Sequence, residues 1–89
     1  MIRVLIANHQ PIVSYGIRML FESSSDIKIV NTVNTKKQLM DYLKKGSIDV
    51  VLFSLDFADS NGITVLRNIK KEFNAIRVLI FSYQPENIY

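Results

Sequence analysis

The stretch DVVLFSLDF (Asp49–Phe57) decides the fold, because a nearly continuous apolar run leads directly into a polar loop. Short apolar runs of this kind are typical of strands buried on both faces of a parallel sheet. Ser54 places a hydroxyl group near the end of the run. Since functional groups gather at the carboxyl ends of parallel strands, we predict a strand over Asp49–Leu55 and a functional position at Ser54.

Three more strands are predicted on either side of this one. The segments are IRVLIA (residues 2–7), IKIVNTV (residues 27–33) and IRVLIFS (residues 76–82). The first is a nearly continuous apolar run, which is consistent with a strand buried on both faces. The middle one alternates apolar and polar residues, so we expect it near an edge of the sheet.

Helical segments separate the predicted strands. They cover residues 12–22, residues 35–46, and the stretch from Ser60 or Asn61 to Phe73, and Pro85 opens a fourth helix. Pro11 suits the first turn of the first helix, because its missing N–H would be unpaired there. Thr35 and Gln38 have the spacing of a capping box, and Gly46 is a natural helix end.

Each predicted helix has one apolar face that we expect to cover the sheet. These faces are Val13, Gly16, Ile17, Leu20 and Phe21 in the first helix; Leu39, Met40 and Leu43 in the second; and Ile63, Leu66, Ile69 and Phe73 in the third. Strands alternating with such helices predict an α/β domain with a doubly wound parallel sheet and right-handed crossovers.

Composition narrows the class of protein. The chain has 89 residues, a net charge of +3 and no cysteine, which allows one domain and excludes disulfides and thiolate metal sites. No apolar run approaches the ~20 residues of a membrane span, and we predict a cytoplasmic location without membrane contact. The paired lysines, such as Lys36 and Lys37, are interpreted as solvated helix faces rather than a phosphate patch.

Three loops should meet at the carboxyl edge of the predicted sheet. They contain Asn8 and His9 after the first strand, Ser54 at the end of the third, and Ser82 after the fourth. The first loop has no G-x-G pattern, which disfavours a nucleotide-binding domain.

Three segments carry a resemblance to a known family: IRVLIANHQPIVSYGIRMLFE (residues 2–22), DVVLFSLDFADSNGITVLRNIK (residues 49–70) and IRVLIFSYQPENIY (residues 76–89). Together they resemble the receiver domain of bacterial two-component response regulators, most closely those of the LuxR/NarL type. The resemblance covers Met1 to Tyr89. It implies an incomplete flavodoxin-like receiver fold with about four strands and three to four helices, which lacks the fifth strand, the last helix and any DNA-binding domain.

The resemblance also implies roles for four positions. In the family, two consecutive acidic residues after the first strand hold Mg²⁺, and Asn8 and His9 stand there in this chain. An aspartate at the end of the third strand accepts the phosphoryl group, and Ser54 occupies its position. A hydroxyl residue after the fourth strand acts as a switch, and Ser82 retains it.

These departures change the expected chemistry. Mg²⁺ prefers carboxylate and carbonyl oxygens, and a serine hydroxyl is a weak nucleophile without a base. We therefore predict a pseudo-receiver that is not an enzyme, binds no metal or cofactor, and acts independently of phosphorylation.

Alternative roles of the loop residues are open at this point. Ser54 is expected to bond to nearby backbone or to Asn8, with modification by an unrelated kinase as the alternative. His9 could join Asp56 and Asp59 in a metal site, although an ordinary loop histidine is favoured. Asp56 could be a relocated phosphoryl acceptor.

The predicted partners are proteins. The fourth strand, Val78–Phe81, would be an exposed apolar edge, so we expect homo-oligomers through this edge or through swapped elements. DNA contact would come only from a C-terminal domain absent from these residues. The alternative functions are a stand-alone partner of another regulator and a flavodoxin-like ligand-binding domain.

Overall fold

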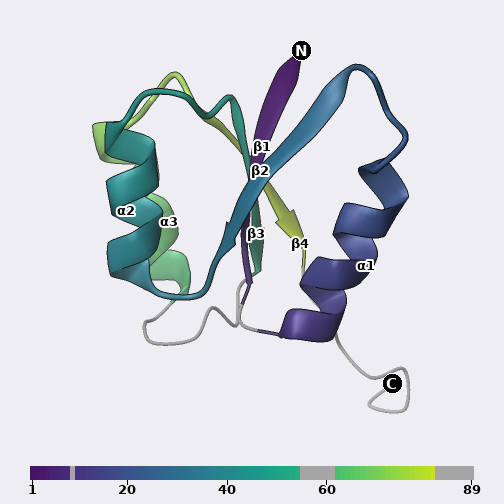
Figure 1. Ribbon diagram of the computed structural model, residues 1–89. Helices are drawn as coiled ribbons and strands as arrows, with labels where there is room; N and C mark the ends of the chain where they lie inside the picture. The colour runs from purple at the N-terminus through teal and green to yellow at the C-terminus, as the bar shows by residue number, and fades with distance from the viewer. Residues whose placement is uncertain (9, 55–61, 82–89) are drawn as a thin grey trace.

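A four-stranded parallel sheet forms the centre of the computed structural model, which describes residues 1–8, 10–54 and 62–81. The strand order is β2-β1-β3-β4 (Figure 1). The strands are β1 (Ile2–Ala7), β2 (Ile27–Val33), β3 (Val50–Ser54) and β4 (Arg77–Phe81). The predicted edge position of the second strand is confirmed, because β2 pairs only with β1 in this order.

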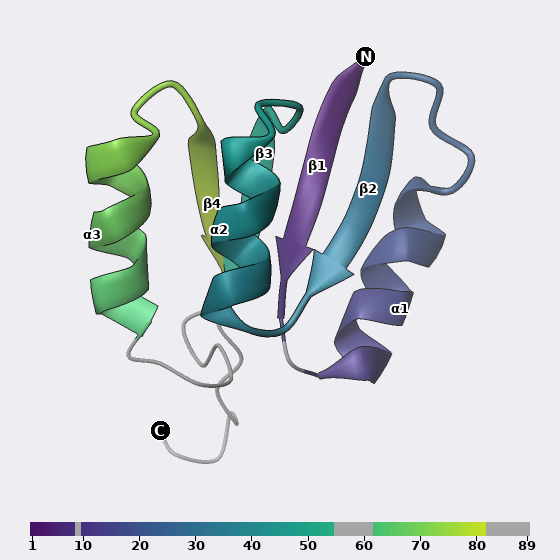
Figure 2. The same ribbon diagram turned by 60° about the vertical axis from the view of Figure 1, so that its left-hand side comes forward.

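Three helices in the described part of the chain cover the two faces of the sheet. They are α1 (Pro11–Phe21), α2 (Lys36–Lys44) and α3 (Gly62–Glu72). Helices α2 and α3 lie on one face, and α1 is the only helix of the described residues on the other (Figures 1 and 2). This confirms the doubly wound α/β arrangement. None of the helices in the described ranges has the length and apolar character needed to cross a membrane.

Local sequence signals set the helix ends. Pro11 begins α1, as predicted. The Thr35 hydroxyl accepts a hydrogen bond from the Gln38 backbone N–H at 3.2 Å and so caps α2. The Gln38 side chain accepts from the Asn34 backbone N–H rather than from that of Thr35, one residue outside the expected capping box. Gly46 follows α2 with a φ of 75°, a conformation that glycine adopts without strain.

The hydrophobic core lies between the sheet and the α2–α3 layer. Its fully buried side chains come from alternate positions of β1 and β3 and from the inner faces of α2 and α3. They include Leu5, Val51, Phe53, Leu39 and Ile69. Alternation follows from strand geometry, in which successive side chains point to opposite faces. Met40, predicted on the inner face of α2, is only half-buried at the margin of this core.

The predicted inner face of α3 was partly wrong. Val65 and Ile69 are buried, Leu66 and Phe73 pack against the core, and Ile63 is exposed. The buried residues Gly62, Val65 and Ile69 define the side of α3 that faces the sheet. Successive residues of a helix are rotated by about 100°, so Ile63 lies to one side of this face.

The predicted face of α1 also needs correction. Val13, Ile17 and Phe21 are half-buried, whereas Gly16 and Leu20 are exposed. The contacting strip of α1 packs chiefly against β2, and no other described helix lies on this face of the sheet. The flank that carries Gly16 and Leu20 therefore has no described neighbour.

Some of the predicted strand and helix boundaries fall outside the described residues. β3 begins at Val50 rather than Asp49, and the expected extension to Leu55 is not within the described ranges. The same holds for Ser82 and for the fourth helix expected from Pro85.

Candidate functional site at the carboxyl ends of the strands

Asn8 and Ser54 lie side by side at the carboxyl edge of the sheet. Ala7 pairs with Phe53 across β1 and β3, so Asn8 and Ser54 are the next residues on these neighbouring strands. Ala7 and Phe53 belong to the core beneath α2 and α3. Because side chains alternate along a strand, Asn8 and Ser54 lie on the face of α1. Both are buried, with 2% and 3% of their surface exposed.

The Asn8 side chain fixes the turn between β1 and α1. Its Oδ1 accepts a hydrogen bond from the Gln10 backbone N–H at 3.2 Å, and its Nδ2 lies 3.5 Å from the Gln10 carbonyl oxygen. Its backbone N–H donates to the Val33 carbonyl oxygen at 3.0 Å. Gln10 is the N-cap of α1 and has no side-chain cap of its own. The Asn8 amide therefore orders the helix entrance, a typical use of asparagine in turns.

Ser54 ends β3 and pairs in register with Phe81 of β4. Its buried hydroxyl carries no charge, and so neither described member of the site supplies a carboxylate. The expected bond between Ser54 and Asn8 or nearby backbone stays a prediction.

The other predicted site residues lie outside the described residues. These are His9, Asp56, Asp59 and Ser82. In the parts of the chain that the structure does describe, no group of three or more His, Cys, Asp or Glu side chains is placed to hold a metal ion.

The described donors are a poor match for Mg²⁺. The Oδ1 of the Asn8 side chain already accepts a hydrogen bond from the Gln10 backbone N–H, and Ser54 offers a neutral hydroxyl. Mg²⁺ sites in proteins use one or two carboxylates and near-octahedral geometry. Asn8 and Ser54 therefore do not fit a bound Mg²⁺ ion.

Sequence reasoning missed Ser14. This residue is on the inner strip of α1, only 5% exposed, and its Oγ has no hydrogen-bond partner in the described structure. Its spacing to Ile17 and Phe21, three and seven residues later, matches the face that contacts the sheet. That spacing was the available signal, but apolar periodicity alone does not mark a serine.

Comparison with known proteins agrees with this architecture. The sequence model of one protein family, the response regulator receiver domain, matches residues 4–89 of this chain. The chain belongs to the response regulator receiver domain family. A receiver domain is a non-catalytic signalling domain, so the prediction that this chain is not an enzyme is confirmed.

The relatives are regulators of the NarL/LuxR type, as the resemblance implied. The Fimbriae Z protein of Escherichia coli K12 is 28% identical over 86 residues, covering 97% of this chain and 41% of the relative. The response regulator UvrY of the same strain is 24% identical over 87 residues, covering 98% and 40%. The chain thus spans about two-fifths of the length of these curated relatives.

Solved structures show the same fold. RcsB of Salmonella typhimurium superposes with a TM-score of 0.86 at 26% identity, over 93% of this chain and 43% of that one. The isolated receiver domain of RcsB from Salmonella enterica serovar Typhimurium gives a TM-score of 0.85 at 25% identity, over 99% and 65%. The predicted receiver fold is confirmed.

Proposed function

We propose that this receiver domain regulates a two-component transcription regulator without being phosphorylated. The observation that carries the proposal is the buried pair Asn8 and Ser54, which puts an amide and a hydroxyl where the family has carboxylates. The domain then acts through contacts with other proteins.

The chemistry of the pair supports this proposal. Phosphoryl transfer depends on in-line positioning and on cations that neutralise the transferring oxygens. A serine hydroxyl needs an adjacent base to become a nucleophile, and Asn8 is not a base. The Asn8 amide is also engaged in the turn to Gln10, so it serves the folded structure rather than a reacting group.

Electrostatics supports a single resting state. Two carboxylates about 4 Å apart repel by about 4 kcal/mol at an effective dielectric constant near 20, and a bound metal offsets this repulsion. Asn8 and Ser54 are neutral, so they pack together without it. Metal binding and phosphorylation therefore no longer shift this domain between an inactive and an active state.

Beryllofluoride with Mg²⁺ provides the test. We expect no saturable chemical-shift changes at the amides of Asn8 and Ser54 when ¹⁵N-labelled protein is titrated with both. The RcsB receiver domain, which was solved in the presence of this phosphomimetic, is the positive control. Saturable shifts at Asn8 and Ser54 would overturn the proposal.

The exposed β4 strand supports association with a second copy of this chain. β4 is the last strand in the described sheet, and Leu79 and Ile80 are 59% and 49% exposed. An apolar strand with unpaired backbone groups favours pairing with another chain. We propose that the 89-residue chain self-associates through this edge or by exchange of elements.

Light scattering coupled to size-exclusion chromatography tests whether the chain self-associates through the β4 edge. The wild type is expected to elute as a dimer, and Leu79→Lys as a monomer, because a lysine on an edge strand opposes strand addition. Leu20→Lys is the matched control, since Leu20 is equally apolar and 78% exposed on α1. A monomeric wild type, or a dimer lost only in Leu20→Lys, would contradict the proposed edge.

Contact with DNA is proposed for another part of the regulator. RcsB has been solved as dimers bound to DNA. By analogy, DNA recognition would belong to a domain outside these 89 residues, and this cytoplasmic receiver would control it. A stand-alone protein that binds another regulator is the alternative, and the length of the open reading frame distinguishes the two.

A further inference from the structure

A pocket lined in part by polar side chains lies between α1 and β2, beside the buried Asn8. Its volume is about 340 Å³. Its described polar lining consists of Asn8, Ser14, Tyr15, Arg18, Thr32 and Asn34. This volume is near the lower end for ligand sites, which run from about 300 to 1,000 Å³.

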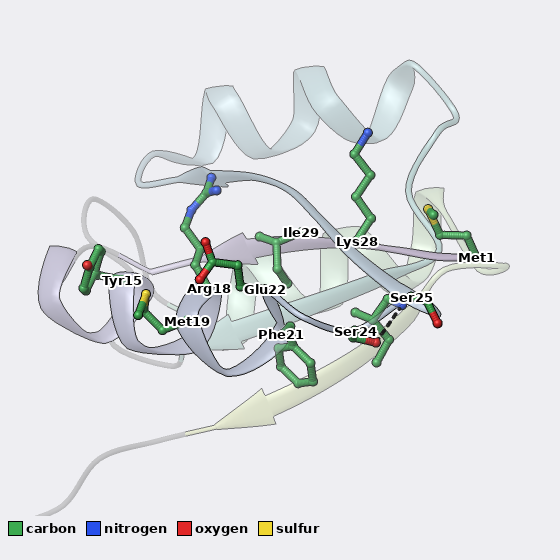
Figure 3. Close-up of a pocket in the computed structure, with 11 residues that line it drawn as sticks. Met1, Tyr15, Arg18, Met19, Phe21, Glu22, Ser24, Ser25, Lys28 and Ile29 are labelled. Carbon is green, nitrogen blue, oxygen red and sulfur yellow. Dashed lines mark hydrogen bonds between the residues drawn. The ribbon is translucent and has the colours of Figure 1, made fainter.

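A second pocket, of about 450 Å³, continues toward the other end of β2 and shares Tyr15 and Arg18 with the first. Figure 3 shows this second pocket, with Arg18 on α1, Glu22 directly after the end of α1, and Lys28 on β2. Glu22 lines the second pocket, whereas no carboxylate of the described residues lines the first. The first pocket is therefore the one suited to a negative charge.

Ser14 gives the first pocket an unused hydrogen-bonding group. Its hydroxyl oxygen is buried, and it has no partner in the described structure. Buried polar groups in proteins nearly always have a hydrogen-bond partner, and leaving one unpaired is unfavourable. Since Ser14 lines the pocket, a ligand there can satisfy it.

Arg18 gives the same pocket a positive charge. Its Nε donates to the Thr32 Oγ1 at 3.4 Å, which holds the guanidinium between α1 and β2. The planar guanidinium fork matches the oxygens of carboxylates and phosphates. Pro11, at the start of α1, also lines the pocket, so the positive end of the helix dipole adds to the field.

We propose that this pocket, named here the oxyanion pocket, binds the phosphate or carboxylate group of a small anionic molecule. Arg18 and the helix end supply charge, and the Ser14 hydroxyl donates a hydrogen bond to one oxygen. Asn8 belongs both to this pocket and to the candidate site beside it, whereas Ser54 does not line the pocket, and the proposal does not depend on whether Ser54 is ever phosphorylated.

Titration with inorganic phosphate and, separately, with acetate tests the oxyanion pocket. Chloride keeps the ionic strength constant, and the amides of Ser14, Thr32 and Asn34 are followed by NMR. We expect saturable shifts with a dissociation constant on the order of 1–10 mM for at least one anion. The anion that binds more tightly identifies the ligand class.

Two variants make the test specific. Arg18→Gln is expected to weaken binding at least about tenfold, and Ser14→Ala about threefold. Arg67→Gln removes the same charge from an exposed position on α3, across the sheet, and should leave binding unchanged. The proposal is overturned by the absence of saturable shifts with both anions, by unchanged binding in Arg18→Gln, or by an equal loss in Arg67→Gln.

Discussion

Phe53→Ala is expected to lower the free energy of unfolding by about 3–5 kcal/mol, as large-to-small changes of buried aromatic residues do. Phe53 is 0% exposed and lies on β3, between β1 and β4, in the core beneath α2 and α3. Its truncation removes apolar contacts and leaves a cavity that a close-packed interior fills only in part. Urea denaturation followed by circular dichroism measures the change.

Leu20→Ala is the control for this loss. Leu20 is 78% exposed on α1, so its truncation should change the free energy of unfolding by no more than about 0.5 kcal/mol. Since a small domain is stable by only about 5–15 kcal/mol, the two variants should be separated clearly in the same titration. Equal effects would mean that the core does not lie where the burial of Phe53 places it.

Replacing both Asn8 and Ser54 with aspartate should lower the free energy of unfolding by at least about 3 kcal/mol at neutral pH without divalent ions. Both positions are buried, and they are neighbours across β1 and β3. Two carboxylates there would lose hydration and repel each other. Mg²⁺ should recover part of the loss in the double variant and leave the wild type unchanged.

Ser54→Asn separates charge from volume in this experiment. It adds a side chain of the size of aspartate without its charge, and Asn8 stays as it is. Urea denaturation with EDTA and with Mg²⁺ compares the three proteins. If Ser54→Asn is as unstable as the double aspartate variant, crowding rather than charge repulsion explains the loss, and the electrostatic argument fails.

The strands were predictable because three of them are compact apolar runs and the second alternates apolar and polar residues. The bounds Ile2–Ala7 and Ile27–Val33 agree with the structure, and the alternation in the second run placed it at an edge. The helix faces were harder to predict. Leu20 is apolar and correctly spaced but faces no described neighbour, and only the three-dimensional arrangement of α1 shows this.

The candidate site also has features that the sequence predicts and features that only the structure shows. Strand ends in a parallel sheet meet at one edge, so the proximity of Asn8 and Ser54 followed from the strand assignments. The hydrogen bonds of Asn8 to Gln10 did not follow, because they depend on the path of a turn. The orphaned hydroxyl of Ser14 also required the structure, since burial and pairing are three-dimensional properties. His9, Asp56 and Ser82 remain predictions.

The strand order β2-β1-β3-β4 determines the order in which the strands can pair as the chain is synthesised. Val4 pairs with Val50, and the Arg3 backbone N–H donates to the Asp49 carboxylate at 2.9 Å. During synthesis, β1 can pair early with β2, but its second edge stays open until β3 has left the ribosome. That closure spans α1, β2 and α2, and such non-local pairing slows folding. Until that point, the open edge of β1 can pair with a strand of another chain.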